Sequence, residues 1–123
     1  HNEAAAQSVS AALAEVAQGR DVHLVIGMLA NKDVIGLLSP FAPLARSLTA
    51  IPVPGHAHHA PAELAEAARS LGIAATGIAQ DPESALQRIT ANLAPDAPAP
   101  VILILGSLYL AGEVLRANDE LPD

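Results

Sequence analysis

Two short segments combine residue types that could hold an anion. Residues 27–33 (GMLANKD) join a glycine, which permits close backbone approach, to Lys32, whose positive charge stands next to Asp33. Gly106 and Ser107 follow a run of five apolar residues, and backbone N–H groups with a hydroxyl could hold a carboxylate there. A turn with a capping Asp or Ser explains the same residues without a ligand. The capped turn is the simpler interpretation of residues 27–33, whereas the capped turn and the ligand site are equally good interpretations of Gly106 and Ser107.

Three histidines, His56, His58 and His59, lie in one proline-bounded segment. Imidazoles can bind zinc or nickel, but a closed site needs further ligands, and Glu63 is the one candidate near them in the sequence. We therefore expect solvated loop histidines and no metal site. His23 alternates with apolar residues, so we expect a hydrogen-bonded residue of a sheet.

Several motifs of catalysis are missing from the sequence. It has no Gly-Lys phosphate loop, no G-x-G-x-x-G pattern after a predicted strand and no nucleophile elbow. It has no cysteine, which excludes disulfides and thiolate chemistry and suits a cytoplasmic location. We therefore expect no catalytic residue within this chain.

The composition narrows the possible partners. Six basic and 13 acidic residues give a net charge of −7, which disfavours nucleic acid and anionic membranes because both need clustered lysines and arginines. A hydrophobic content of 51% with 15% charged residues indicates a folded chain, and 123 residues suit one domain. The longest apolar stretch, residues 101–112, is too short to cross a bilayer.

Apolar periodicity predicts the elements that must position these residues. The expected helices are 3–18, a segment that starts near residue 33, 81–93 and 107–117, with one more at 61–71; the expected strands are 22–27, 47–53, 73–78 and 101–105. This alternation predicts an α/β three-layer, Rossmann-like sandwich with a mostly parallel sheet. Ligands of such sheets bind at the carboxyl ends of the strands, where residues 27–33, 54–60 and 106–109 fall.

Three details of packing and capping follow from the same patterns. Val9, Leu13 and Val16 are expected on the buried face of the first helix. The apolar residues 101–105 are typical of a parallel strand that is buried on both faces. Asp81, followed by proline and glutamate, is expected to be a helix N-cap.

Three stretches together resemble the C-terminal domain of the folylpolyglutamate synthase/dihydrofolate synthase family, within the Mur ligase superfamily. His1 and Asn2 look like the end of the family's D-G-x-H-N motif. Residues 27–33 are similar to its G-M-L-x-D-K-D stretch, with Asn31 in place of the usual aspartate. Residues 106–113 (GSLYLAGE) resemble its G-S-L-Y-L-x-G-E segment. The three occur in the family's order and span nearly the whole chain, which the resemblance makes a fragment of a larger one.

The resemblance implies an ATP-dependent ligase that adds L-glutamate to dihydropteroate or folate through an acyl phosphate. His1 and Asn2 would then be on the nucleotide side, while Ser107, Lys32 and Asp33 would face glutamate. The family's P-loop, magnesium ligands and most folate contacts belong to the part outside this chain. ATP and Mg²⁺ are thus expected in the full-length enzyme, whereas the isolated chain is expected to bind no cofactor and to be inactive.

The resemblance also implies a sheet with the strands in the order fourth, first, second, third, all parallel. Strand 101–105 would then be an apolar edge open to self-association. Two other functions remain possible at this point. One is the C-terminal domain of a peptidoglycan Mur ligase, against which the GSLY segment argues, and the other is a free-standing flavodoxin-like binding module.

Overall fold

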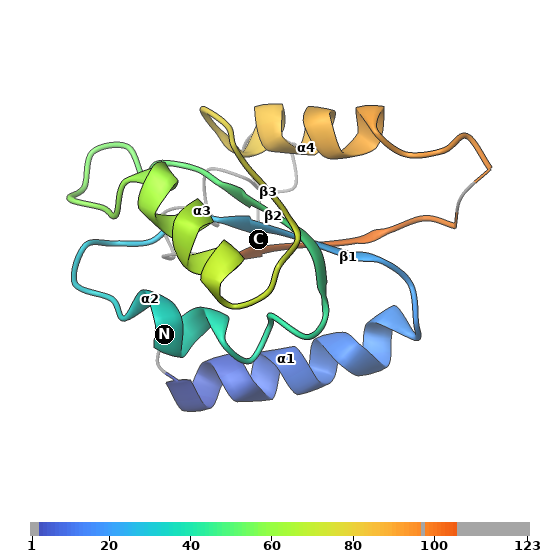
Figure 1. Ribbon diagram of the computed structural model, residues 1–123, viewed down its shortest axis with the longest axis horizontal. Helices are drawn as coiled ribbons and strands as arrows, with labels where there is room; N and C mark the ends of the chain where they lie inside the picture. The colour runs from blue at the N-terminus through green and yellow to red at the C-terminus, as the bar shows by residue number, and fades with distance from the viewer. Residues whose placement is uncertain (1–2, 97, 106–123) are drawn as a thin grey trace, which may run out of the picture.

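A parallel sheet lies between two layers of helices in the computed structural model (Figure 1). The structure describes residues 3–96 and 98–105. The elements in this part of the chain are α1 (Glu3–Ala17), β1 (Val22–Ile26), α2 (Val34–Leu38), β2 (Ala45–Ala50), α3 (Pro61–Ser70), β3 (Ala75–Ile78), α4 (Pro82–Ala91) and β4 (Val101–Leu105). The helix expected at 107–117 lies outside the described residues.

The strand order is β3-β2-β1-β4, and every neighbouring pair is parallel. This confirms both the three-layer α/β fold and the predicted order. The central strand β1 pairs Leu24 with Leu48 of β2 and with Leu103 of β4. Parallel neighbours bring all carboxyl ends to one edge of the sheet, so the loops that follow β1 and β2 leave from the same side.

Each face of the sheet has its own apolar core. Leu24 and Ile26 of β1 are fully buried in the core on the side of α1, α2 and α3 (Figure 1). Val25, which lies between them, belongs to the core on the opposite side with Ala85 and Ile89 of α4. Because side chains alternate along a strand, a strand covered on both faces must be apolar at nearly every position.

The buried face of α1 differs from the predicted one. Leu13 is buried as expected, but Val9 and Val16 are exposed, with 41% and 61% of their surface accessible. The buried positions are those of Ala6, Ser10, Leu13 and Ala17. Small residues at three of these four positions let the helix lie close to its neighbours, and the burial of Ser10 is offset by its hydroxyl, which donates to the Gln7 carbonyl at 2.9 Å.

Strand β4 packs against a core on each face of the sheet, but its residues are only half-buried, so the expectation of burial on both faces is confirmed in part. Its place in the sheet gives the reason. Within the described residues it pairs with β1 on one side only, at the end of the strand order. The self-association expected of this apolar edge stays a prediction.

Two element boundaries also differ from the expected ones. The helix that starts after Asp33 is short, because α2 ends at Leu38 and turns follow as far as Leu44. Pro40, two residues beyond Leu38, accounts for this, because proline lacks the backbone N–H that would continue the helical hydrogen bonds. Strand β2 therefore begins at Ala45 and ends at Ala50, earlier than predicted. No helix in the described part of the chain has the length and apolar character needed to cross a membrane.

The predicted N-cap of α4 is confirmed. Asp81 precedes Pro82, which is the first helical residue, and its Oδ1 accepts the Ser84 N–H at 2.7 Å. This hydrogen bond holds the pKa of the Asp81 carboxyl below its ordinary value. A depressed pKa in the folded state means that the ionised carboxylate stabilises the fold at neutral pH.

We expect Asp81→Ala to lower the free energy of unfolding at pH 7, and Asp81→Asn to lower it far less, since Asn also caps helices. The difference between wild type and Asp81→Ala should shrink as the pH falls below about 4 and through the depressed pKa, because protonation removes the charged acceptor. Urea unfolding of the three proteins at a series of pH values measures this. An Asp81→Ala deficit that stayed constant down to acidic pH would contradict the assignment.

Candidate functional site

The two loops that follow β1 and β2 are joined by backbone hydrogen bonds. The Ala30 N–H donates to the Ala57 carbonyl at 3.0 Å, and the His59 N–H donates to the Met28 carbonyl at 2.9 Å. Leu29 and His58 form an isolated antiparallel bridge between these contacts. The structure thus brings together residues 27–33 and 54–60 at the carboxyl edge, as the sequence predicted.

His59 makes a side-chain contact between these loops. Its Nε2 lies 2.9 Å from the Lys32 carbonyl oxygen, so the ring N–H at this position donates. Its Nδ1 lies 3.8 Å from Glu63 Oε2, one turn further along the chain at the start of α3. The prediction of a solvated histidine was therefore wrong for His59, which holds the backbone of the neighbouring loop in place.

The other two histidines of this segment interact differently. His56 is exposed, and its carbonyl accepts a hydrogen bond from Nδ1 of the half-buried His58 at 2.8 Å. Within the described residues, no three His, Asp or Glu side chains lie close enough together to hold a metal ion. Among the described residues, this edge can therefore bind a ligand through hydrogen bonds and single charges.

Lys32 and Asp33 stand at the end of the first loop with different degrees of restraint. The Lys32 backbone is held on both sides, since its N–H donates to the Leu29 carbonyl at 3.1 Å and its carbonyl accepts from His59. The Lys32 side chain is half-buried and makes no ion pair with a described residue. This arrangement leaves an ammonium group on a fixed backbone at the carboxyl edge.

Asp33 is exposed and occupies the N-cap position of α2, but its carboxylate makes no capping hydrogen bond. The simple interpretation of Asp33 as a side-chain cap was therefore wrong. The anion attraction expected of this helix start is also weak, because α2 has only five residues and an acidic residue at its beginning. What this turn offers a ligand is the pair of opposite charges on Lys32 and Asp33.

The end of β4 lies beside the end of β1. The Gly27 N–H donates to the Leu105 carbonyl at 3.1 Å, so the chain leaves the two strands at neighbouring points. Ser107 lies outside the described residues, as do His1 and Asn2. The roles that the resemblance implies for these three residues stay predictions.

His23 is a hydrogen-bonded residue of the sheet, as expected, with its Nδ1 2.6 Å from the Ser47 hydroxyl. Its Nε2 is buried and has no hydrogen-bond partner among the described residues. Burial lowers the pKa of His23, Asp21 opposes this shift, and Arg46 adds to it. His23 is the second residue of β1, at the far end of the strand from the two loops, and it does not belong to their site.

Sequence reasoning missed the role of His59, although a local signal was present. His59 and Glu63 are spaced by four residues across the start of a helix, and side chains at this spacing can meet when the chain turns into a helix. That spacing distinguishes His59 from His56 and His58. The partner carbonyl of Lys32 is 27 residues away in the sequence, and no local pattern indicates it.

Comparison with known proteins places this geometry in a family. The model of the glutamate ligase domain of Mur ligases matches residues 1–108. A comparison with curated protein sequences finds no match.

Solved structures are similar over almost the whole chain. The bifunctional folylpolyglutamate synthase/dihydrofolate synthase of Yersinia pestis, complexed with AMPPNP and Mn ion, is 26% identical with a TM-score of 0.78, over 97% of this chain and 27% of that one. A bifunctional enzyme of the same kind with Mn, AMPPNP and L-glutamate bound is 27% identical with a TM-score of 0.74, over the same two shares.

The folylpolyglutamate synthase of Mycobacterium tuberculosis, complexed with ADP, shares the fold at 23% identity with a TM-score of 0.84, over 100% of this chain and 29% of that one. The chain therefore spans less than a third of the length of the enzymes that it matches. The family model covers 108 of the 123 residues, the parallel sheet has the predicted order, and the loops meet at its carboxyl edge. The chain belongs to the family of Mur ligase C-terminal domains, the glutamate ligase domains.

Proposed function

We propose that the chain is the C-terminal domain of an ATP-dependent ligase that adds L-glutamate to dihydropteroate or a folate. The observation that carries the proposal is the loop of residues 27–33, which resembles a motif of that family and is fixed at the carboxyl edge by His59. Similar enzymes have been solved with AMPPNP and Mn, and one of them with L-glutamate. They are about a quarter identical to this chain, so the acceptor is part of the proposal.

In this proposal the chain supplies the glutamate-side wall of a shared site. ATP with Mg²⁺ converts the acceptor carboxylate into an acyl phosphate, and the groups that hold them lie outside this chain, apart from a nucleotide-side contact from His1 and Asn2. Lys32 attracts a carboxylate of glutamate, and the Ser107 hydroxyl donates to a carboxylate. Asp33 attracts the ammonium group before it loses its proton. Such contacts orient the amine toward the acyl carbon, which is catalysis by positioning.

The hydrogen bonds between the strands support the grouping of Lys32, Asp33 and Ser107 in one site. The Leu105 carbonyl accepts a hydrogen bond from the N–H of Gly27, and Gly27 begins the loop that ends in Lys32 and Asp33. Ser107 follows Leu105 by two residues, and two residues span at most about 7 Å. One loop and the segment after β4 can therefore contribute to one binding site for a small amino acid.

A chimera tests the proposal. The matching domain of the Yersinia pestis enzyme is replaced by this chain, and ADP release is measured with glutamate and dihydropteroate or a folate. We expect activity that requires both glutamate and the acceptor. A second chimera with the matching Mycobacterium tuberculosis domain controls for the junction. Activity of the control with none from this chain would overturn the proposal.

The peptidoglycan Mur ligase alternative is tested in the same system. The amino acids assayed are extended to D-glutamate with the folate acceptor held fixed, because the acceptor is bound mostly by the part of the enzyme outside this chain. Release of ADP with D-glutamate, and none with L-glutamate, would assign the chain to the other branch of the superfamily.

His59→Ala in the chimera is expected to lower kcat/KM for glutamate roughly fivefold, mainly through KM. The variant loses a hydrogen bond that contributes about 1 kcal/mol. The Lys32 backbone is then less restrained, so its ammonium group is placed less accurately. His59→Gln, which keeps an N–H donor, should recover part of the loss. Steady-state kinetics with glutamate varied at saturating MgATP measures this, and equal loss in both variants would contradict a role for the hydrogen bond.

A further inference from the structure

A groove lined by three arginines lies at the β3 edge of the sheet and shares no lining residue with the two loops of the candidate site. Arg46, Arg69 and Arg88 share it with His23 and Thr49, and its volume is about 520 Å³. Arg46 and His23 are the second residues of their strands, whereas Arg88 is anchored at Ile78, the last residue of β3, so the groove extends along the β3 edge of the sheet. Three of the six basic residues of a chain with net charge −7 therefore gather at one place.

Arg88 lies close to the edge strand β3 because Gly77 has no side chain at that point. Its guanidinium donates to the Ile78 carbonyl, and a Cβ added to Gly77 would lie only 3.1 Å from Arg88 Nη2. Glycine is unfavourable inside a strand unless something approaches closely. Here the approaching group is a guanidinium, so Gly77 gives Arg88 its place over β3.

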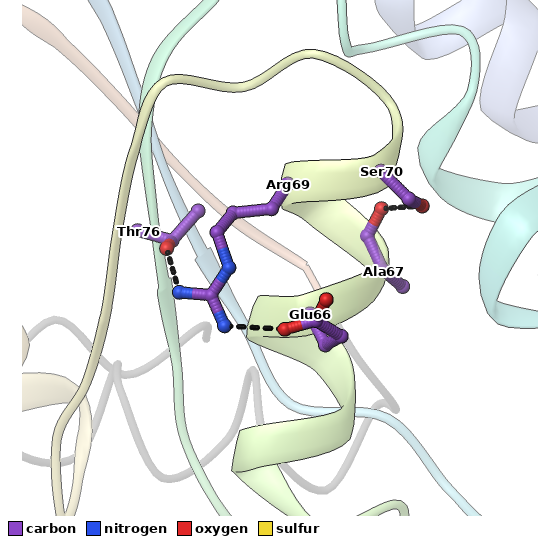
Figure 2. A network of polar contacts seen from close by, with 5 residues as sticks. All are labelled: Glu66, Ala67, Arg69, Ser70 and Thr76. Atoms are coloured by element: carbon purple, nitrogen blue, oxygen red, sulfur yellow. Dashed lines mark hydrogen bonds and ion pairs between the residues drawn. The ribbon is translucent and has the colours of Figure 1, made fainter.

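Arg69 reaches the same strand from α3. Figure 2 shows its guanidinium between Thr76, whose Oγ1 accepts from Nη1 at 3.1 Å, and Glu66, whose Oε2 lies 2.6 Å from Nη2. Arg69 and Arg88 are thus anchored to β3 at positions two residues apart, Thr76 and Ile78. A guanidinium has five N–H donors, so both side chains keep donors beyond those used for anchoring.

Arg46 differs from the other two. It is exposed on β2 and makes no hydrogen bond or ion pair with a described residue. Glu66 forms an ion pair with Arg69, and Asp21 lies near His23 and Arg46, so within the described residues the three guanidinium charges exceed the carboxylates that face them. Like charges that gather without compensation repel one another, and a bound anion would remove this repulsion.

We propose that this groove binds a small anion with two or more phosphate or carboxylate groups, at a site separate from the glutamate-side loops. Anchored guanidiniums present planar forks that match such oxyanions, and their anchoring reduces the freedom lost on binding. Arg69 and Arg88 are the anchored members of the site and approach the edge strand β3 from opposite faces of the sheet, whereas Arg46 is the adjustable member. This binding does not depend on the acceptor or the activity proposed above.

Calorimetry with the 123-residue chain tests the proposal, with inorganic pyrophosphate as the phosphate probe and citrate as the carboxylate probe. We expect saturable binding of at least one of them at physiological ionic strength, where exposed charges farther apart than about 8 Å no longer interact strongly. Arg46→Gln should weaken it about tenfold or more, because one charge-assisted contact is lost. Gly77→Ala should weaken it through Arg88.

Arg20→Gln is the matched control. Arg20 is exposed and donates to carbonyls at the end of α1, and it does not line the groove. Arg46→Gln breaks no described contact, so circular dichroism should show an unchanged fold. Stronger binding of pyrophosphate than of citrate assigns a phosphate ligand, and the reverse assigns a carboxylate ligand. No saturable binding of either probe, or equal weakening by Arg46→Gln and Arg20→Gln, would overturn the proposal.

Discussion

Ser107→Ala is expected to lower kcat/KM for glutamate roughly ten- to hundredfold in a ligase that contains this chain, while KM for MgATP stays near its original value. The hydroxyl is proposed to donate to a charged carboxylate, and such a hydrogen bond contributes about 1.5–3 kcal/mol. The amine of a poorly held glutamate reaches the acyl carbon less often, so the loss should fall on glutamate alone. The chimera described above, assayed with each substrate varied in turn, measures it.

Ser70→Ala is the matched control for this variant. The Ser70 hydroxyl is exposed and donates to the Ala67 carbonyl of its own helix at 2.7 Å (Figure 2), and Ser70 is the last residue of α3, whose first residues adjoin the second loop. Ser70→Ala also removes a serine hydroxyl, but from a residue that is not part of the proposed glutamate side. If Ser107→Ala left both kcat and KM for glutamate unchanged, or changed them no more than Ser70→Ala does, Ser107 would have no place in the site.

The topology was predictable because each level of the sequence agrees with it. Apolar runs of four to six residues separated by helical periodicity require βα units, and right-handed crossovers restrict how such units join. The family resemblance then selected one strand order. Local capping was equally readable, since Asp81 and Pro82 specify a helix start by chemistry that involves only their near neighbours.

Burial was harder to predict than topology. Valines were favoured over alanines for the inner face of α1, yet Val9 and Val16 are exposed while Ala6 and Ala17 are buried. Periodicity gives the angular spacing of a face, but an alanine-rich helix offers more than one face of similar apolarity. Close approach of the helix to its neighbours then favours the small residues, and that distance is set by tertiary packing.

The two polar clusters differ in how far the sequence indicated them. Lys32 and Asp33 were found because they follow a strand and enter a helix, which is a local pattern. The contact of His59 with Lys32 and the meeting of Arg46, Arg69 and Arg88 depend on which strands are neighbours. Glycine in the middle of a short strand, at Gly77, was the one local sign of the arginine groove.

The isolated chain is expected to fold and to ligate nothing. The described residues hold no group suited to a metal ion, and the sequence has no Gly-Lys phosphate loop. At the carboxyl edge a triphosphate would meet Lys32 and, by the resemblance, His1. Even millimolar affinity requires about 4 kcal/mol, and one exposed charge contributes about 0.3–1 kcal/mol near a helix end. These contacts must also offset the freedom that the ligand loses on binding.

Two measurements separate this expectation from anion binding in the arginine groove. ADP release by the chain with glutamate, MgATP and either acceptor should stay at the level without protein. Calorimetry with MgATP should show any weak binding to be lost in Arg46→Gln and kept in Lys32→Gln, because a nucleotide attracted by charge alone would occupy the groove. Micromolar binding that survives Arg46→Gln and is lost in Lys32→Gln would mean that the loops form a complete nucleotide site. The chain would then be a nucleotide-binding module in its own right, and the proposal that it is one wall of a shared site would fail.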